Sequence, residues 1–292
     1  MNEPRESDSE PKEPFFEPKA AAKMPWMIGL FDVLGFSQRI ATDGAEKVFS
    51  DYKTLIESVV KIDPMRCLGL ARWPGESVRV PALFTTEVRY TYFSDTILLW
   101  LPLHPLFAGP FVQRCSDLIC EALQMGIPLR GTIALGEGFM HKQSGTFLGS
   151  HIVEAARLEA AQNWIGVAFA PSATWGKFMA ELSPTQITEY EIPVKDGKED
   201  LRSPIALDWP RRWRESKKPS LQDKLRQLAV PGNLAIYYNE AIAFADWSEK
   251  HHNWHERSDI QNRFKHLRMR LESELVENER SSEMDTNQAK SS

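Results

Sequence analysis

The sequence predicts an α+β protein of ferredoxin-like (split βαβ) architecture, with extra strands and a C-terminal helical region. Between residues 25 and 170, short apolar runs alternate with segments of helical spacing. Two of the apolar runs are joined by Ser94 and Asp95, which are turn-forming residues and predict a hairpin. From about residue 221 the spacing is mostly helical. The predicted order is therefore β-α-β-β-α-β, then β-α-β, followed by helices.

The first half of this region supplies a strand, a helix and the hairpin. The continuous apolar run "PWMIGLFDVL" (25–34) predicts a buried strand. Residues 46–62 predict a helix, because apolar side chains recur there at helical spacing: Val48, Phe49, Tyr52, Leu55, Ile56 and Val59. Residues 72–88 contain two prolines and predict a loop with short strands. "RYTYFSDTILLWLPL" (89–103) predicts the hairpin.

The second half repeats the alternation. The predicted elements are a helix at 107–126, a strand at 128–141, a short strand and a helix within 145–163, and a strand at 164–171. Ser150 is expected to be the N-cap of the helix in 145–163, because its hydroxyl suits that position. Further strands are expected near 186–194 and 203–209.

Composition divides the chain into four segments. Residues 1–22 are acidic and proline-rich, which predicts a disordered N-terminal arm. Residues 23–210 are the predicted α+β domain, and residues 211–278 are a mostly helical C-terminal extension. Residues 279–292 are polar and predict a disordered tail. The sequence contains no internal repeat.

Length, charge and cysteine content narrow the class of protein. The 292 residues are 42% hydrophobic and 26% charged, as in an ordinary globular protein. The net charge of −5 gives no attraction to nucleic acid or to an anionic membrane, so neither is expected as a partner. Three sparse cysteines, the absence of a long apolar run and a polar start without a signal peptide together predict a cytoplasmic protein.

Asp32 stands out because it is the one carboxylate inside the apolar run 25–34. An unpaired buried carboxylate costs several kcal/mol, so a cation, a metal or backbone amides must compensate it. The first and second strands of a β-α-β-β order commonly lie side by side, which would bring Asp32 near Asp95 in the hairpin turn. Two converging carboxylates repel, and a divalent cation such as Mg²⁺ or Mn²⁺ removes the conflict. The alternative is that each Asp is a turn or cap residue.

The segment after Asp32, "VLGFS", joins a strand to a helix and is a candidate anion site, because helix N-termini bind anions through free amides. No Walker-type motif occurs, and a simple glycine turn is the alternative. Arg157 and Arg130 are candidates for stabilising a phosphoryl transition state. Ordinary solvated or ion-paired roles remain open for both.

Two further patterns favour structural roles. His251 and His255 are spaced as a helical metal pair, but the sequence offers no third ligand, which favours a solvated or core-edge role. The segment 209–218, "WPRRWRESKK", interleaves basic residues with Trp, a pattern that can bind nucleic acid. In an acidic chain, a segment that covers the core is the favoured interpretation.

Four stretches in order, "FDVLGFS", "FSDTILLW", "RGTIALGE" and "FLGSHIVEAARLE", resemble the catalytic domain of class III nucleotidyl cyclases. The closer resemblance is to the bacterial pyrimidine cyclases of Pycsar anti-phage defence, over roughly residues 25 to 210. It implies a lyase that converts a nucleoside triphosphate into a 3′,5′-cyclic monophosphate and pyrophosphate, as a second-messenger synthase. It also implies a homodimer whose active sites lie at the subunit interface.

The resemblance assigns roles to individual residues. Asp32, the Val33 peptide and Asp95 would hold two divalent cations, Mg²⁺ or Mn²⁺. The backbone after Asp32 would cradle the triphosphate, at Val33, Gly35, Phe36 and Ser37. Arg157 matches the arginine that the family supplies across the dimer interface. Arg130 is kept as a further catalytic candidate.

Three positions depart from the family pattern. An Asn that precedes the arginine by four in many class III enzymes is Val153 here. The Lys and Asp that read adenine in mammalian-type enzymes are Thr91 and Thr146. Two hydroxyls suit a pyrimidine, and UTP is the first-choice substrate, with CTP open. The alternatives are a purine cyclase that uses ATP or GTP, and a catalytically silent module that binds a nucleotide or dimerises.

Overall fold

The structure is a computed structural model that describes residues 23–60, 65–72, 79–141, 145–174, 176–216, 219–229, 232 and 234–251. The predicted arm at 1–22, the predicted tail at 279–292 and the part of the extension beyond residue 251 lie outside the described residues. So does His255 of the predicted histidine pair.

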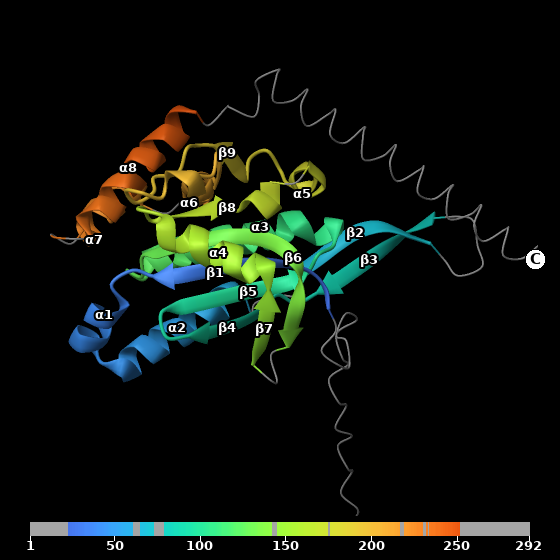
Figure 1. The fold of residues 1–292 in the computed structure, drawn as a ribbon, viewed down its shortest axis with the longest axis horizontal. Coiled ribbons are helices and arrows are strands. Elements are labelled where there is room, and N and C mark those ends of the chain that lie inside the picture. The colour runs from blue at the N-terminus through green and yellow to red at the C-terminus, as the bar shows by residue number, and fades with distance from the viewer. Residues whose placement is uncertain are drawn as a thin grey trace, which may run out of the picture.

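A mixed eight-stranded open sheet forms the centre of the molecule (Figure 1). Its strands run in the order β4 (Arg89–Phe93), β5 (Thr96–Pro102), β1 (Met24–Val33), β6 (Leu129–His141), β8 (Gly166–Phe169), β10 (Ile205–Leu207) and β9 (Ile187–Glu189), and β7 (Thr146–Gly149) pairs with the end of β6. Only the β6–β8 pair is parallel among these pairings. The α+β class predicted from the sequence is confirmed.

A separate two-stranded sheet joins β2 (Met65–Arg72) to β3 (Arg79–Thr86) and projects away from the main sheet (Figure 1). A loop with short strands was expected at 72–88, and no element was predicted at 65–72. These strands instead pair with each other over eight residues each. Their pairing depends on a partner strand rather than on a pattern within either strand, and for this reason periodicity missed it.

The neighbours of β1 differ from the expectation. The first and second strands were expected side by side, but β1 lies between β5 and β6, and β4 is at the sheet edge. Burial explains the order, because Trp26 to Phe31 of β1 are buried on both faces and require a central position. The side chains of β4 are only half-buried or exposed, which suits an edge strand.

Helices cover both faces of the sheet. The elements before β8 include α1 (Phe36–Asp43), α2 (Ala45–Val59), α3 (Pro105–Gln124) and α4 (Ser150–Ala161). The C-terminal helices are α5 (Gly176–Glu181), α6 (Trp209–Glu215), α7 (Leu221–Leu228) and α8 (Ala235–Lys250), with short 3₁₀ turns at Pro171–Thr174 and Glu199–Leu201. Among the helices of the described residues, none combines the length and apolarity needed to cross a bilayer.

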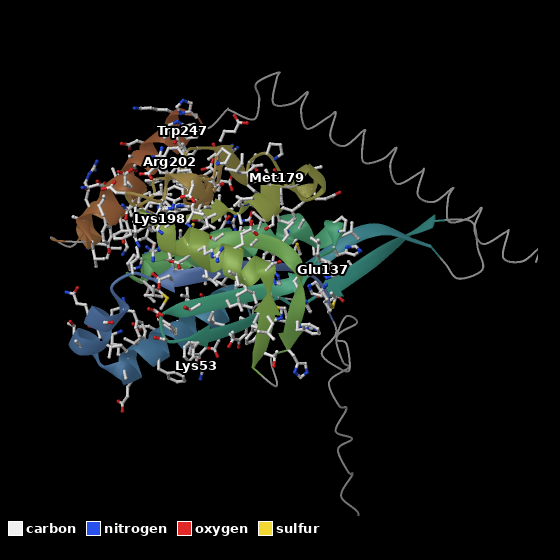
Figure 2. The ribbon with its side chains drawn as sticks, in the orientation of Figure 1. Lys53, Glu137, Met179, Lys198, Arg202 and Trp247 are labelled. Atoms are coloured by element: carbon white, nitrogen blue, oxygen red, sulfur yellow. The ribbon has the colours of Figure 1, made fainter. Side chains whose placement is uncertain are left out.

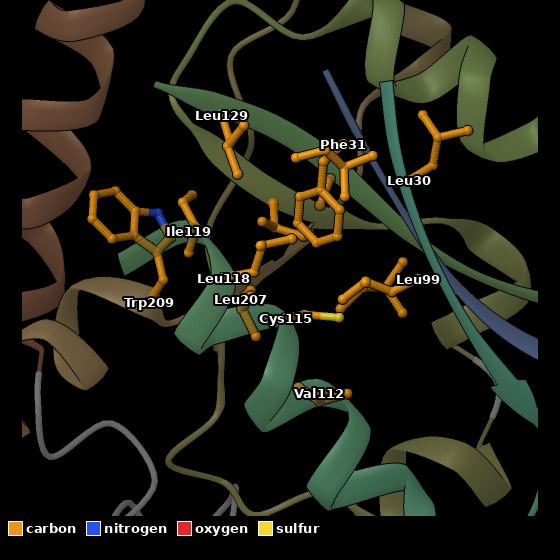
Figure 3. Packing of buried hydrophobic residues seen from close by; sticks show 14 of the residues in the cluster. Leu30, Phe31, Leu99, Val112, Cys115, Leu118, Ile119, Leu129, Leu207 and Trp209 are labelled. Carbon is orange, nitrogen blue, oxygen red and sulfur yellow. The ribbon is translucent and has the colours of Figure 1, made fainter. Parts of the chain in front are cut away.

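Alternation along β1 sends neighbouring side chains to opposite faces of the sheet. Phe31 packs with Leu99 of β5 and Cys115 of α3 in the main hydrophobic core (Figure 3). Asp32 lies on the other face, where its partner Arg130 contacts Glu159 of α4. The strand therefore carries a core side chain and a polar site side chain at consecutive positions.

The start of α4 differs from the prediction, and the basic segment 209–218 agrees with it. Ser150 was expected to be an N-cap, but α4 begins at Ser150 and its N-cap is Gly149, with no capping side chain. The basic segment 209–218 forms α6 over most of its length, and it buries Trp209 and Trp213 against the core. The covering role expected for this segment agrees with that burial.

Candidate functional site

The structure brings Asp32 and Asp95 to the same end of the sheet. Asp32 is the penultimate residue of β1 and pairs with Thr96, the first residue of β5. The Val33 amide donates a hydrogen bond of 2.9 Å to the Asp95 carbonyl oxygen, which fixes the hairpin turn to the end of β1. Burial is the main cause that raises the pKa of Asp32, and the charge of the nearby Asp95 carboxylate raises this pKa further. This approach depends on β5, the second strand of the hairpin, and not on β4.

Arg130 of β6 links Asp32 to α4. Its Nη2 donates to Asp32 Oδ2 at 3.0 Å, its Nε donates to Glu159 Oε1 at 2.5 Å, and its Nη1 donates to the Gln162 carbonyl at 3.0 Å. The arginine is only 7% exposed. Its guanidinium is therefore bonded to groups of the same chain, and its contact with Asp32 Oδ2 holds that carboxylate in position.

Carboxylates outnumber cations in this cluster. Burial raises the pKa of Asp32 and that of Glu159, which reaches about 7, while the Arg130 charge opposes both shifts. Lys195 is the second cation that acts on Asp32, and its Nζ donates to the Ala160 carbonyl at 2.6 Å. Three carboxylates, including Asp95, thus face two cations. A bound cation would favour the ionised forms of Asp32 and Asp95 together.

The donor set fits a hard divalent cation in part. Within the described residues, no cluster of three or more His, Cys, Asp or Glu side chains is placed to hold a metal. Asp32 and Asp95 with a peptide oxygen such as that of Val33 are instead the kind of set that Mg²⁺ uses, since this ion usually binds one or two carboxylates together with substrate phosphates. Arg130 binds Oδ2 of Asp32, and Oδ1 has no partner in the part of the chain that the structure describes.

The amides at the start of α1 follow directly after Asp32. The Val33 and Leu34 amides are not available to a ligand, because they donate to the carbonyl oxygens of Asp95 and Pro128, which corrects the expectation that the Val33 amide binds phosphate. Gly35 is the N-cap of α1 and has φ = 74°, a left-handed conformation that favours glycine. No side chain of the described residues caps this end of α1, so the first-turn amides that include Phe36 and Ser37 are free of a capping side chain. The positive end of the helix dipole is therefore open to an anion.

No protein-family model and no curated protein matches the sequence.

Arg157 and Val153 are not brought to the carboxylates within one chain. Both are exposed on the outer face of α4, and Val153 is 52% exposed. The buried face of the same helix carries Glu159, which contacts Arg130. Arg157 is thus available only to a ligand or a molecule that approaches this outer face.

Thr91 and Thr146 are not brought together within one chain, because strand register places Thr91 level with Thr132 of β6 and Thr146 level with His141. Thr91 of β4 is opposite Leu98 of β5, and Thr146 of β7 is opposite His141 of β6. Both are partly exposed. Next to Thr146, Phe147 packs edge-on against Trp100 of β5 at a ring distance of 5.1 Å, which holds β7 close to the β4–β5 hairpin.

Sequence reasoning missed Glu159, Lys195 and Tyr237. Glu159 is an acidic residue in an alanine-rich helix, and Lys195 lies in a polar loop, so neither has a pattern that separates it from surface residues. Tyr237 of α8 places its ring 5.7 Å from the Arg130 guanidinium carbon. Only the tertiary contacts with Arg130 distinguish these residues.

A pocket of about 220 Å³ lies beside the 33–37 segment. It is open to one side and is lined by α1, the turn that precedes β6 and the C-terminal helices, through Leu34, Gly35, Gln38, Arg39, Thr42, Asp43, Gly126, Pro128, Leu228, Leu234 and Tyr238. Asp32 and Asp95 do not line it. Residues of the C-terminal helices and residues of the candidate anion site therefore line the same pocket.

Proposed function

We propose that the chain is a class III-like nucleotidyl cyclase that converts a pyrimidine nucleoside triphosphate, UTP first, into a 3′,5′-cyclic monophosphate and pyrophosphate. The observation that carries the proposal is the approach of Asp32 to Asp95 directly beside the uncapped N-terminus of α1. The strand order β4-β5-β1-β6, with a helical crossover on each side of the hairpin, supports a split βαβ core of the kind that the resemblance implies.

The chain's own groups have separate tasks in this reaction. The amides at the start of α1 bind the triphosphate, and the strand ends hold Asp32 and Asp95 in fixed positions beside it. Two divalent cations bound at these carboxylates would neutralise charge on the phosphates. The 3′ oxygen of the nucleotide loses its proton to solvent and bonds to the α-phosphorus. The bond from this phosphorus to the bridging oxygen of the β-phosphate breaks, and pyrophosphate leaves.

Arg157 is proposed to stabilise the charge that develops on the phosphates, from the second subunit of a homodimer. Its exposure on α4, away from Asp32 of the same chain, supports supply across an interface. Three exposed apolar side chains, on β4, β7 and α4, support the presence of an interface between copies of the chain: Phe93 (81% exposed), Leu148 (62%) and Val153 (52%). Arg130 is proposed to position Asp32 rather than to contact substrate.

Pyrimidine preference is proposed from Thr91 and Thr146, which offer hydroxyls where an adenine-reading pair would need charge. A cytoplasmic role as a second-messenger synthase in anti-phage defence is proposed from the resemblance alone.

The test is turnover of the purified full chain with UTP, CTP, ATP and GTP supplied separately, each with Mn²⁺, and with cyclic products identified by mass spectrometry. Cyclic UMP is the expected major product. If only ATP or GTP gives a cyclic product, the pyrimidine preference is overturned, while the proposed cyclisation reaction stands. If none of the four nucleotides gives a cyclic product, the proposed enzymatic activity is overturned and a catalytically silent module is favoured. Val153, which stands where many class III enzymes have Asn, would explain such a loss of activity.

A further inference from the structure

The N-terminal half of α8 contacts the candidate site at two places. The Tyr237 ring lies 5.7 Å from the guanidinium carbon of Arg130, within the range of a cation–π contact. A Cβ atom at Gly35 would lie 3.1 Å from Leu234 Cδ1, so the residue just before α8 packs against the N-cap of α1. The C-terminal helices thus touch both the arginine that holds Asp32 and the segment proposed to bind phosphate.

The other half of α8 is anchored away from the site. Phe244 packs against Trp164 at 4.8 Å, and Trp247 packs against Tyr190 at 5.4 Å. Ser248 Oγ donates to Asp208 Oδ1 at 2.5 Å. Trp247 lies in the C-terminal layer, on the opposite side of the molecule from Lys53 of α2 (Figure 2). The Phe244 and Ser248 contacts fix the helix axis, and the helix in turn fixes where the Tyr237 ring lies.

A backbone contact fixes the same turn of α8 more directly. The Tyr237 carbonyl accepts a hydrogen bond of 3.2 Å from the Ile165 amide, which lies just before β8. Because β8 is the parallel neighbour of β6, the strand that carries Arg130, ring and guanidinium are held by adjacent strands of one sheet.

We propose that Tyr237 is a positioning residue for Arg130 and, through it, for Asp32. Two carboxylates compete for this guanidinium, Asp32 at 3.0 Å and Glu159 at 2.5 Å. The Tyr237 ring covers the guanidinium and restricts its movement, so that the fork reaches both carboxylates at once. Without the ring, water hydrates the guanidinium. The contact to Asp32 then loosens first, because it is longer than the contact to Glu159. The inference rests on the proposed function only in linking Asp32 to metal and turnover.

The experiment compares variants of the full chain. Tyr237→Leu removes the ring, Tyr237→Phe keeps the ring and removes only the hydroxyl, and Tyr237→Met is a second ring-free variant should the leucine variant fail to fold. Trp247→Leu is the matched control, because it removes a half-buried aromatic ring from the same helix without touching Arg130. The readouts are the Arg130 Nε–H signal by NMR, identified by its loss in Arg130→Lys, and the dissociation constant for Mn²⁺ alone by calorimetry.

In the ring-free variants we expect the Arg130 signal to shift and to exchange faster with water, and Mn²⁺ to bind about two- to thirtyfold more weakly, the fold-change that a cation–π contact corresponds to. Tyr237→Phe and Trp247→Leu are expected to behave as wild type. An unchanged Mn²⁺ affinity in the ring-free variants overturns the inference, and so does an equal loss in Trp247→Leu. If both readouts change while wild type cyclises no nucleotide, the inference stands and the proposed function fails.

Discussion

Arg130 Nη2 donates a 3.0 Å hydrogen bond to Asp32 Oδ2, although 98 positions separate the two residues in the chain. The contact places the one carboxylate of β1 between a buried guanidinium and the Asp95 turn. It thereby holds Asp32 in a single orientation at the end of the strand.

Asp32→Asn and Asp95→Asn are each expected to lower turnover by at least about a thousandfold, because each removes half of the proposed cation-binding charge. The change in unfolding free energy of Asp95→Asn should stay within about 1 kcal/mol, since the amide keeps the shape of the carboxylate and relieves repulsion with Asp32. Asp32→Asn should destabilise the fold more, since it removes a charged partner of the buried Arg130 guanidinium. Steady-state assays and urea denaturation measure the two effects. Asp200→Asn, at an exposed position, is the control. Full activity in either variant contradicts the metal-binding role.

Stability should depend on pH through Glu159. Burial raises its pKa from 4.5 to about 7, so the folded chain binds this proton more tightly than the unfolded chain does. The resulting stabilisation is complete below about pH 4.5 and is lost as the pH rises through about 7. Glu159→Gln cannot titrate. Relative to that variant, wild type is expected to lose about 1 to 3 kcal/mol of unfolding free energy between pH 5 and pH 8 in urea titrations.

The comparison is made with EDTA present, so that no metal binds during unfolding. A constant difference between wild type and Glu159→Gln across this range contradicts a raised pKa at Glu159, and a difference that grows in favour of wild type reverses its sign.

Arg157→Ala is expected to abolish most turnover while it changes the unfolding free energy by less than about 0.5 kcal/mol, because the side chain is exposed. Mixing this variant with Asp32→Asn provides the sharper measurement. Each mixed dimer then contains one site with both defects and one site with neither, so random exchange restores about a quarter of wild-type activity. If the mixture is no more active than its components, Arg157 does not act across an interface.

Phe93→Lys is expected to weaken dimerisation and to lower turnover in parallel. Phe93 is 81% exposed next to the Asp95 turn, so a charge there opposes burial in an interface without disturbing the core. Sedimentation velocity over a concentration series measures the dimer fraction. Phe49→Lys is the matched control, because Phe49 is 58% exposed on α2. Equal dimer fractions in wild type and Phe93→Lys place the interface elsewhere.

Most elements could be predicted because their patterns are local. The apolar run of β1, the hairpin turn at Ser94 and Asp95 and the helical spacing of α2 each depend on residues within a few positions of one another. The strand order could not be predicted in the same way. It follows from which strands need burial on both faces, and this is a property of the assembled sheet.

For the candidate site, three groups could be singled out from the sequence: a carboxylate in an apolar strand, a second carboxylate in a turn, and a glycine before a helix. These features are visible because each breaks a local pattern. Only the tertiary structure decided what surrounds them. Arg130 lies against Asp32, Glu159 and Tyr237 because two strand pairings and two helices bring distant segments together. A shared guanidinium has no sequence signature, because its partners are chosen by distance in space and not along the chain.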